Sequence, residues 1–199
     1  MTALQQFFSV IDNWEHKLQM RLLYESGCRV GEFVRIRLKH LDFGNHSVFF
    51  PAENTKTKQA RTSYVSEGLM NEIKDYLKRY GRISKRDERI VAPDEFLFVS
   101  QAKERNSDKG ISENRVRQIF SFYIKKAGLQ QVYGHDRRGR ALHLYTVHSL
   151  RHSHIMHAKH LRQIKDSIVA KQVGHTSLQA MSAYDQPSSE IHKQAYLRF

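Results

Sequence analysis

The strongest constraint on the fold is a change in the spacing of apolar residues along the chain. From Ala3 to about Ser26 they recur at helical spacing, and Asn13 is placed to divide this stretch into two helices. Two short β-prone runs follow at 47–50 and 62–65, on either side of a polar turn, which predicts a hairpin. Helical spacing then returns. The chain is therefore expected to be mainly α (α+β), with a small antiparallel β-sheet.

Further elements are predicted from the same spacing and from capping signals. Gly27 is positioned to end the first helical region, and Glu32–Leu38 is expected to form a short helix. Later helices are expected at 67–80, 112–128, 148–160, 162–173, 177–184 and 188–197, with a strand at 96–99. The Gly- and Arg-rich stretch YGHDRRGRALH is expected to be a connector. The length of 199 residues suits one substantial core, although it could just hold two small domains, and one domain is expected over residues 1–199.

The charge of the chain favours a polyanionic partner. Its 199 residues include 33 Lys and Arg against 20 Asp and Glu, a net charge of +13. Such an excess attracts nucleic acid through counterion release, although a solvated basic surface or a ribosome-associated protein remains an alternative. Cys28 is the single cysteine, which excludes an internal disulfide and suits a reducing cytoplasm. We see no signal peptide and no apolar run of membrane-spanning length, so we expect a cytoplasmic, DNA-associated protein with no membrane partner.

Four residues near the C-terminus stand at a spacing that suggests phosphate chemistry: His148, Arg151, His175 and Tyr184. A phenol is a poor nucleophile at neutral pH because its pKa is about 10. Attack by a phenol on a phosphodiester needs cations to neutralise the phosphate and donors to stabilise the developing charge. His148 and Arg151 are three residues apart, which puts both on one face of a helix.

Each candidate residue also has an ordinary structural interpretation. Arg29, three residues before Glu32, is typical of a surface ion pair, and Lys56 in NTKTKQART is typical of a solvated turn, where Lys58 competes for any role. The histidines can be satisfied structural residues. Tyr184 taken alone can be a half-buried core tyrosine. The order of all the signals along the chain carries more weight than any one of them.

That order resembles the tyrosine recombinase (phage integrase) family over nearly the whole chain. The matching stretches are SGCRVGE, the hairpin segment TKTKQAR, HSLRHSH and KQVGHTSLQAMSAY. The resemblance implies a tyrosine recombinase-like (DNA breaking-rejoining) fold and a site-specific recombinase or integrase. Such enzymes cleave and rejoin double-stranded DNA through a 3′-phosphotyrosyl intermediate, without metal, ATP or cofactor, and self-associate on DNA as dimers to tetramers.

The resemblance also assigns roles to residues. Arg29 and Arg151 become the phosphate clamp and Lys56 the general acid. His148 and His175 become the phosphate- and proton-handling histidines, and Tyr184 the nucleophile. Because the match begins almost at Met1, a single catalytic domain is expected, with no separate N-terminal DNA-clamping domain in this chain. The chain is then either a shorter, single-domain form of the family or an isolated catalytic domain.

Three rival interpretations stay open at this point. His148 with His152, and His154 with His157, have spacings compatible with zinc, but Arg151 among them would repel a cation, so no metal is expected. A type IB topoisomerase would use nearly the same residues to relax supercoils. A non-catalytic basic DNA-binding protein would explain the charge, but it would not need Tyr184 in register with His175.

Overall fold

The computed structural model describes residues 2–84, 86, 89–100 and 110–175. Its first two helices are α1 (Ala3–Ser9) and α2 (Trp14–Ser26). Asn13 separates them as predicted, because its side chain accepts a hydrogen bond from the backbone N of His16 and so caps α2. Gly27 ends α2 in the left-handed conformation, at φ 61°. The interpretation of Ala3–Ser26 as two helices is confirmed.

The short helix predicted at Glu32–Leu38 is wrong in both of its limits. Helix α3 spans Val30–Phe33, and a separate 3-10 turn, η1, spans Leu38–His40. The Glu32 carboxylate accepts from the backbone N of Arg29, which starts α3 directly after Arg29. Beyond Phe33 the chain pairs with 95–97 instead: Leu97 N donates to Ile36 O at 2.8 Å, and Leu38 N donates to Glu95 O at 2.9 Å.

The predicted hairpin lies in a three-stranded antiparallel sheet. Its strands are β1 (Leu41–Asp42), β2 (Ser47–Phe50) and β3 (Arg61–Tyr64), in the order β1-β2-β3. The connection between β2 and β3 contains a 3-10 turn, η2 (Ala52–Asn54). The hairpin is confirmed, with Phe50 opposite Arg61 at the end of the ladder next to the connecting loop.

Two long helices complete the first part of the chain, α4 (Glu67–Arg79) and α5 (Glu113–Lys126). Ser66 and Ser112 cap their N-termini, so both helices agree with the sequence prediction. The strand predicted at 96–99 is wrong. Phe96 and Val99 form only isolated bridges, to Arg37 and to Gly110, because their partners belong to no continuous strand.

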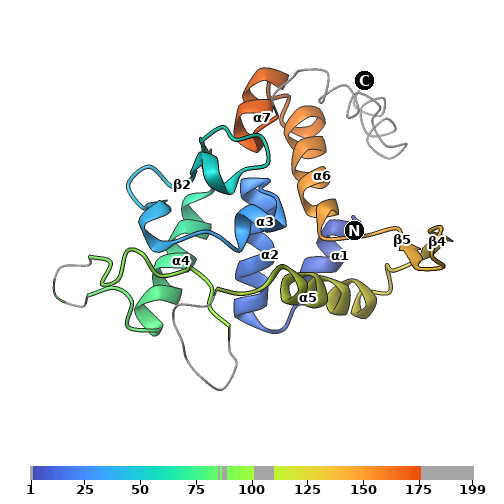
Figure 1. The fold of residues 1–199 in the computed structure, drawn as a ribbon, viewed down its shortest axis with the longest axis horizontal. Helices are drawn as coiled ribbons and strands as arrows, with labels where there is room; N and C mark the ends of the chain where they lie inside the picture. The colour runs from blue at the N-terminus through green and yellow to red at the C-terminus, as the bar shows by residue number, and fades with distance from the viewer. Residues whose placement is uncertain (1, 85, 87–88, 101–109, 176–199) are drawn as a thin grey trace.

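The stretch expected to be a connector is a second hairpin. Strands β4 (Val132–His135) and β5 (Ala141–His143) pair antiparallel and form a sheet of their own. The hairpin extends away from the helices at one end of the molecule (Figure 1). The connector prediction is therefore wrong.

The C-terminal part of the described chain packs beside α2 (Figure 1). It contains α6 (His148–Met156), a π-helical turn η3 (His157–Leu161), and α7 (Asp166–Val173). The helices predicted at 148–160 and 162–173 are confirmed in position, although the second begins at Asp166. The helices predicted at 177–184 and 188–197 lie outside the described residues. In the part of the chain that the structure describes, no helix is long and apolar enough to cross a membrane.

The core consists of one large apolar cluster and a smaller one. The large cluster surrounds α2, whose Met20 and Leu22 are fully buried, and it extends to α4 and α5 through Ile73 and Val116. The small cluster joins α6, η3 and α7 through Ile155, Ala158, Val169, Ala170 and Val173. The C-terminal ends of α2 and α7 lie on either side of Arg151, which donates a hydrogen bond to a carbonyl at each.

Candidate active site

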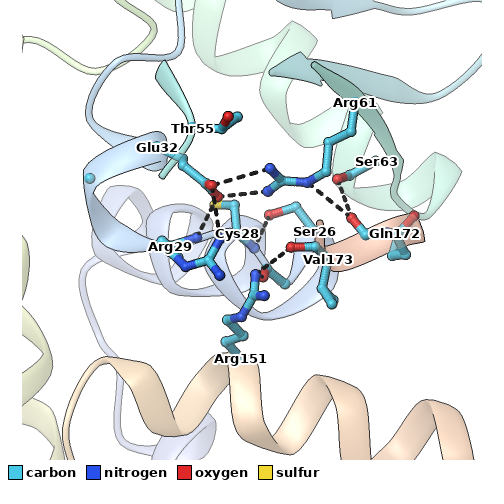
Figure 2. A network of polar contacts seen from close by, with 12 residues as sticks. Ser26, Cys28, Arg29, Glu32, Thr55, Arg61, Ser63, Arg151, Gln172 and Val173 are labelled. Carbon is cyan, nitrogen blue, oxygen red and sulfur yellow. Dashed lines mark hydrogen bonds and ion pairs between the residues drawn. The ribbon is translucent and has the colours of Figure 1, made fainter. Parts of the chain in front are cut away.

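Two arginines from distant parts of the sequence meet where α2 ends and α3 begins. Arg29 directly precedes α3, and Arg151 projects from α6 toward the same region (Figure 2). The Nη1 of Arg151 donates to the carbonyl oxygens of Gly27, at 2.5 Å, and of Val173, at 2.7 Å. These carbonyls lie at the ends of α2 and α7, where backbone acceptors lack helical partners. Arg151 therefore ties two helix ends together.

The other terminal nitrogen of Arg151 has no such partner. Within the described residues, its Nη2 is buried and makes no hydrogen bond. Burial, followed by the nearby charge of Arg29, lowers the pKa of Arg151 to about 10. The side chain stays charged at neutral pH, and a buried charge without full compensation is costly. An anion that brings acceptor oxygens to this point would stabilise it.

Glu32 is the acidic centre of the site. It is 2% exposed, and it accepts from the backbone N of Arg29 at 2.8 Å and from Arg29 Nη1 at 3.3 Å. Its two carboxylate oxygens also accept from Arg61, at 3.1 and 2.6 Å. Burial raises the pKa of Glu32, but the hydrogen bonds and charge of Arg61 more than offset this, so its pKa lies below the usual value. The Arg29–Glu32 ion pair forms, but the expectation that it lies at the surface is wrong, because the Glu32 side chain is buried.

Arg61 is the residue that the sequence interpretation missed. Besides its two bonds to Glu32, its Nε donates to Gln172 O at 3.3 Å, and its guanidinium lies 4.4 Å from the centre of the Phe50 ring. Gly174, at φ 71°, sits against it, and a Cβ there would come within 2.9 Å of the Arg61 side chain. Arg61 thus joins β3, α3 and the end of α7 (Figure 2). Its place two residues before Ser63, on the inward face of β3, is the signal that could have revealed its burial.

Both candidate histidines lie within the electrostatic field of these arginines. His148 is the first residue of α6 and keeps part of its surface exposed to solvent. Partial desolvation of its ring, followed by the charges of Arg117 and Arg151, lowers its pKa. His175 follows Gly174, where its backbone N donates to Ala170 O at 2.9 Å. Burial, then the charges of Arg151 and Arg29, lower the pKa of His175 to about 4. Both imidazoles are therefore neutral at pH 7, and each can donate from one nitrogen while accepting at the other.

The remaining two candidates are Lys56 and Tyr184. Lys56 is exposed on the loop between β2 and β3, next to the buried Thr55, whose hydroxyl accepts from Gln59 N and donates within the loop. In the described chain, no hydrogen bond or ion pair links Lys56 to Arg29, Arg151 or the histidines. Tyr184 lies outside the described residues.

The site as a whole is cationic. Among the described residues, the guanidiniums of Arg29, Arg61 and Arg151 lie around the carboxylate of Glu32, and these four groups together carry a net charge of +2. No group of three or more His, Cys, Asp or Glu residues is placed to hold a metal ion in the described ranges. What the geometry supplies is a set of fixed cations and neutral imidazoles suited to an anion such as a phosphodiester.

The sequence resembles known recombinases along most of its length. A model of the phage integrase family matches residues 1–190. The chain is 28% identical to tyrosine recombinase XerA of Pyrococcus furiosus, over 94% of this chain and 55% of that protein. It is 23% identical to transposase A from transposon Tn554 of Staphylococcus aureus, over 98% of this chain and 50% of that protein. The chain thus spans about half the length of the curated relatives it matches.

Solved structures share its fold. The crystal structure of XerA recombinase superimposes with a TM-score of 0.70 at 17% identity, covering 98% of this chain and 62% of that one. The XerH recombinase bound to palindromic difH, a post-cleavage complex, gives a TM-score of 0.68 at 16% identity, covering 98% and 50%. These likenesses confirm the mainly α, tyrosine recombinase-like fold expected from the sequence.

Proposed function

This chain belongs to the phage integrase family, and from that premise we propose that it is a site-specific DNA recombinase. It cleaves and rejoins DNA strands through a 3′-phosphotyrosyl intermediate. The observation that carries the proposal is that Arg29 and Arg151, which are far apart in sequence, lie close together in the structure. The Nη2 of Arg151 is buried there and makes no hydrogen bond in the described chain. A phosphodiester supplies the charge and the acceptor oxygens that this nitrogen needs.

The proposed reaction needs neither metal nor nucleotide. The Tyr184 oxygen attacks the phosphorus, a bond forms between them, and the bond from phosphorus to the 5′-oxygen breaks. The phenolic proton leaves through His175 or His148, which are neutral at pH 7 and so can accept it. Lys56 gives a proton to the departing 5′-oxygen. Rejoining runs these steps in reverse.

The arginines act on the charge that builds up on phosphorus. Arg29 and Arg151 hold the non-bridging oxygens, and Glu32 fixes Arg29 by accepting from both its backbone and its side chain. Arg151 is itself fixed by its bonds to Gly27 and Val173. Because both groups are positioned before the substrate arrives, little reorganisation is needed in the transition state.

The partner that fits this site is double-stranded DNA. The charge of +13 favours a polyanion, and the titles of similar structures name DNA substrates for XerH and for the Tn1549 integrase. We extend this to the present chain, with self-association as dimers to tetramers on DNA and a location in the cytoplasm with the nucleoid. A single catalytic domain spans the chain in this proposal.

The decisive experiment is a covalent-adduct assay on DNA recovered by selection of bound sequences. A nicked duplex of that sequence should trap wild-type protein in a complex that survives denaturation. Tyr184→Phe keeps the ring and removes only the hydroxyl, so it should bind the duplex and form no adduct. Tyr145→Phe is the matched control, since Tyr145 is half-buried against the core and should be dispensable.

Three outcomes would contradict the proposal in different ways. An adduct in Tyr184→Phe that vanishes in Tyr145→Phe moves the nucleophile to Tyr145. DNA binding without any wild-type adduct indicates a non-catalytic DNA-binding protein. Adduct and relaxation of supercoils without exchanged strands indicates a topoisomerase.

A further inference from the structure

The β4–β5 hairpin has features that the proposed chemistry does not use. All of its strand residues are exposed except Gly134, which is half-buried, so neither face of the ribbon packs on the body of the protein. Tyr133 is 68% exposed and Val132 is 52% exposed. A two-stranded hairpin with two solvated faces is only marginally stable in water. The hairpin therefore needs contacts outside its own two strands, either with the rest of the protein or with a partner, to be stable.

The base of the hairpin is firmly held. The side-chain amide of Gln130 donates to Tyr145 O at 3.2 Å and accepts from Tyr145 N at 3.3 Å. Leu144 N donates to Gln131 O at 2.9 Å, and Tyr145 packs against the large core cluster. The hairpin is thus anchored at the junction of α5 and α6, while its turn is carried outward (Figure 1).

The turn presents positive charge. Asp136 accepts from Arg138 N at 2.8 Å, from Arg140 N at 2.9 Å and from Arg140 Nε at 2.7 Å. Gly139, at φ 74°, completes this turn. The one acid is thus engaged within the turn, whereas Arg137 and Arg138 have exposed side chains. Three arginines against one aspartate give the tip a net charge of +2.

The hairpin also lies next to the site. Only residues 144–147 separate β5 from His148, the first residue of α6. At a strand rise of about 3.3 Å per residue, the turn is carried roughly 13 Å from the base at Leu144. A two-stranded β-ribbon of this kind fits the major groove of B-DNA.

We propose that the β4–β5 hairpin is a DNA-binding arm, in which Arg137 and Arg138 bind phosphates of the duplex flanking the scissile phosphate. The inference rests on the proposed function, because it takes the position of the cleaved strand from Arg151 and His148. Charge complementarity selects DNA as the occupant, since the tip offers two uncompensated guanidiniums that match phosphate oxygens. The side chain of Asp136 pairs with Arg140, so the guanidiniums of Arg137 and Arg138 do not have to break a contact with Asp136 before they bind phosphate.

The test is the salt dependence of binding to a mixed-sequence duplex roughly 40 base pairs long, measured by fluorescence anisotropy. The double variant Arg137→Ala/Arg138→Ala leaves the Asp136–Arg140 contacts intact. Loss of two phosphate contacts should reduce the slope of log K against log salt by roughly 1.8, at about 0.9 per contact. Arg137→Lys/Arg138→Lys keeps both charges and should retain most of the slope.

Two further variants test whether the loss of slope comes from the hairpin or from any loss of positive charge. Lys78→Ala/Arg79→Ala removes the same charge from the end of α4, on the other side of the molecule (Figure 1), and should change the slope by less than half as much. Replacing residues 132–143 by Asn-Gly joins Gln131 to Leu144, whose backbones are already hydrogen-bonded, and should reproduce the loss.

An unchanged slope in the hairpin variants, or an equal loss in the α4 control, overturns the DNA-binding arm. If wild-type protein forms the tyrosine adduct in that case, the recombinase function is still supported and only the DNA-binding arm is rejected. Conversely, the hairpin variants can show the expected loss of slope while wild-type protein forms no adduct. That result supports the DNA-binding arm and rejects the recombinase. A wild-type protein that does not bind the duplex overturns both.

Discussion

The β2–β3 and β4–β5 hairpins both carry arginines, and they use them in opposite ways. Arg61, at the start of β3, is buried and bonded to Glu32 and Gln172. Arg137 and Arg138, in the turn of the other hairpin, are exposed. Burial makes the first arginine a part of the protein's own structure, because a buried guanidinium needs a permanent acceptor. Exposure leaves the others available to an external anion.

The same contrast holds for the acids that accompany them. Glu32 is buried among guanidiniums, and removing Arg61 would take away the two hydrogen bonds and the charge that Arg61 gives to this buried carboxylate. Asp136 lies in an exposed turn, and its ion-pair partner Arg140 is 73% exposed. The same chemical groups therefore contribute differently to stability: the β2–β3 hairpin is fixed to the site by buried ion pairs, and the β4–β5 hairpin is not. Each prediction below tests one side of this difference.

The largest effect is expected at the loop of the β2–β3 hairpin. Lys56→Ala should slow strand cleavage by roughly 10²–10⁴-fold, because the departing 5′-oxygen then leaves without a proton donor. A 5′-bridging phosphorothiolate substrate needs no such proton, so it should largely restore the rate. The rate is measured by adduct formation in a single turnover, and chelators should not change it.

Lys58→Ala is the matched control for this experiment, since Lys58 is exposed on the same loop at φ 54°. It should cleave normally. Arg151→Ala should be slow and should gain nothing from the phosphorothiolate, because the charge on phosphorus remains unneutralised. Rescue that appears for Lys58→Ala and not for Lys56→Ala would transfer the role of general acid to Lys58.

Arg61→Ala is expected to have the next largest effect. It leaves the buried Glu32 carboxylate with Arg29 alone, which should lower the free energy of unfolding by about 3 kcal/mol. Cleavage should also slow, because Glu32 and the segment leading to His175 lose their common support. Urea unfolding and single-turnover cleavage at saturating protein measure the two effects separately.

The double variant Glu32→Gln/Arg61→Met separates positioning from stability. With the charge pair removed together, much of the stability should return, because no buried carboxylate is left unpaired. The cleavage rate should stay low, since the amide introduced by Glu32→Gln has one acceptor oxygen and no charge, whereas the carboxylate of Glu32 accepts from the backbone and the side chain of Arg29 with two oxygens. If rate and stability recover together, Arg61 acts only on stability.

A smaller effect is expected from pH, through a histidine behind the site. Burial, then the charge of Arg151, lowers the pKa of His154 to about 4, and its ring packs against Tyr24. The unfolded chain therefore takes up a proton near pH 6.5, where the folded one does not. The contribution of neutral His154 to the free energy of unfolding is therefore complete above about pH 6.5 and is lost as the pH falls toward 4. The loss amounts to about 1–2 kcal/mol between pH 7 and 5.

Urea unfolding at several pH values measures this loss. His154→Phe keeps an aromatic ring beside Tyr24 and removes the titrating group, so its stability should fall less between pH 7 and 5. His135→Phe, on the exposed β4 strand, is the control and should keep the wild-type slope. Equal slopes in wild-type and His154→Phe protein would show that other groups dominate the acid response.

Local signals were enough to predict most helices. Asn13 and Ser112 cap helices through contacts a few residues away, and Gly27 ends α2 by its own conformation. Such interactions are visible in a short stretch of sequence. The strand predicted at 96–99 failed because its apolar residues are buried against neighbours, with only isolated backbone bridges.

Features that depend on distant or solvent-facing partners were not predictable. The burial of Arg61 requires Glu32, 29 residues earlier, and Gln172, 111 residues later. The sequence predicts a connector at the β4–β5 hairpin because both faces of this hairpin are exposed, so its sequence lacks the apolar-polar alternation of a half-buried strand. For the site, the structure brings Arg29, Arg151, His148 and His175 into one electrostatic field, while the roles of Lys56 and Tyr184 stay predictions.

The smallest effect is expected in the turn of the β4–β5 hairpin. Asp136→Asn removes the charge that faces Arg140 but keeps an acceptor oxygen for the backbone N of Arg138 and of Arg140. An exposed ion pair contributes little, because water and salt screen it, so no measurable change in melting temperature is expected. Binding to a mixed-sequence duplex at low salt should tighten slightly, since the turn loses its one negative charge. Glu32→Gln, the same chemical change at the buried acid, should lower the melting temperature clearly. If Asp136→Asn destabilises the protein as much as Glu32→Gln does, the two acids are equivalent and the contrast between the hairpins fails.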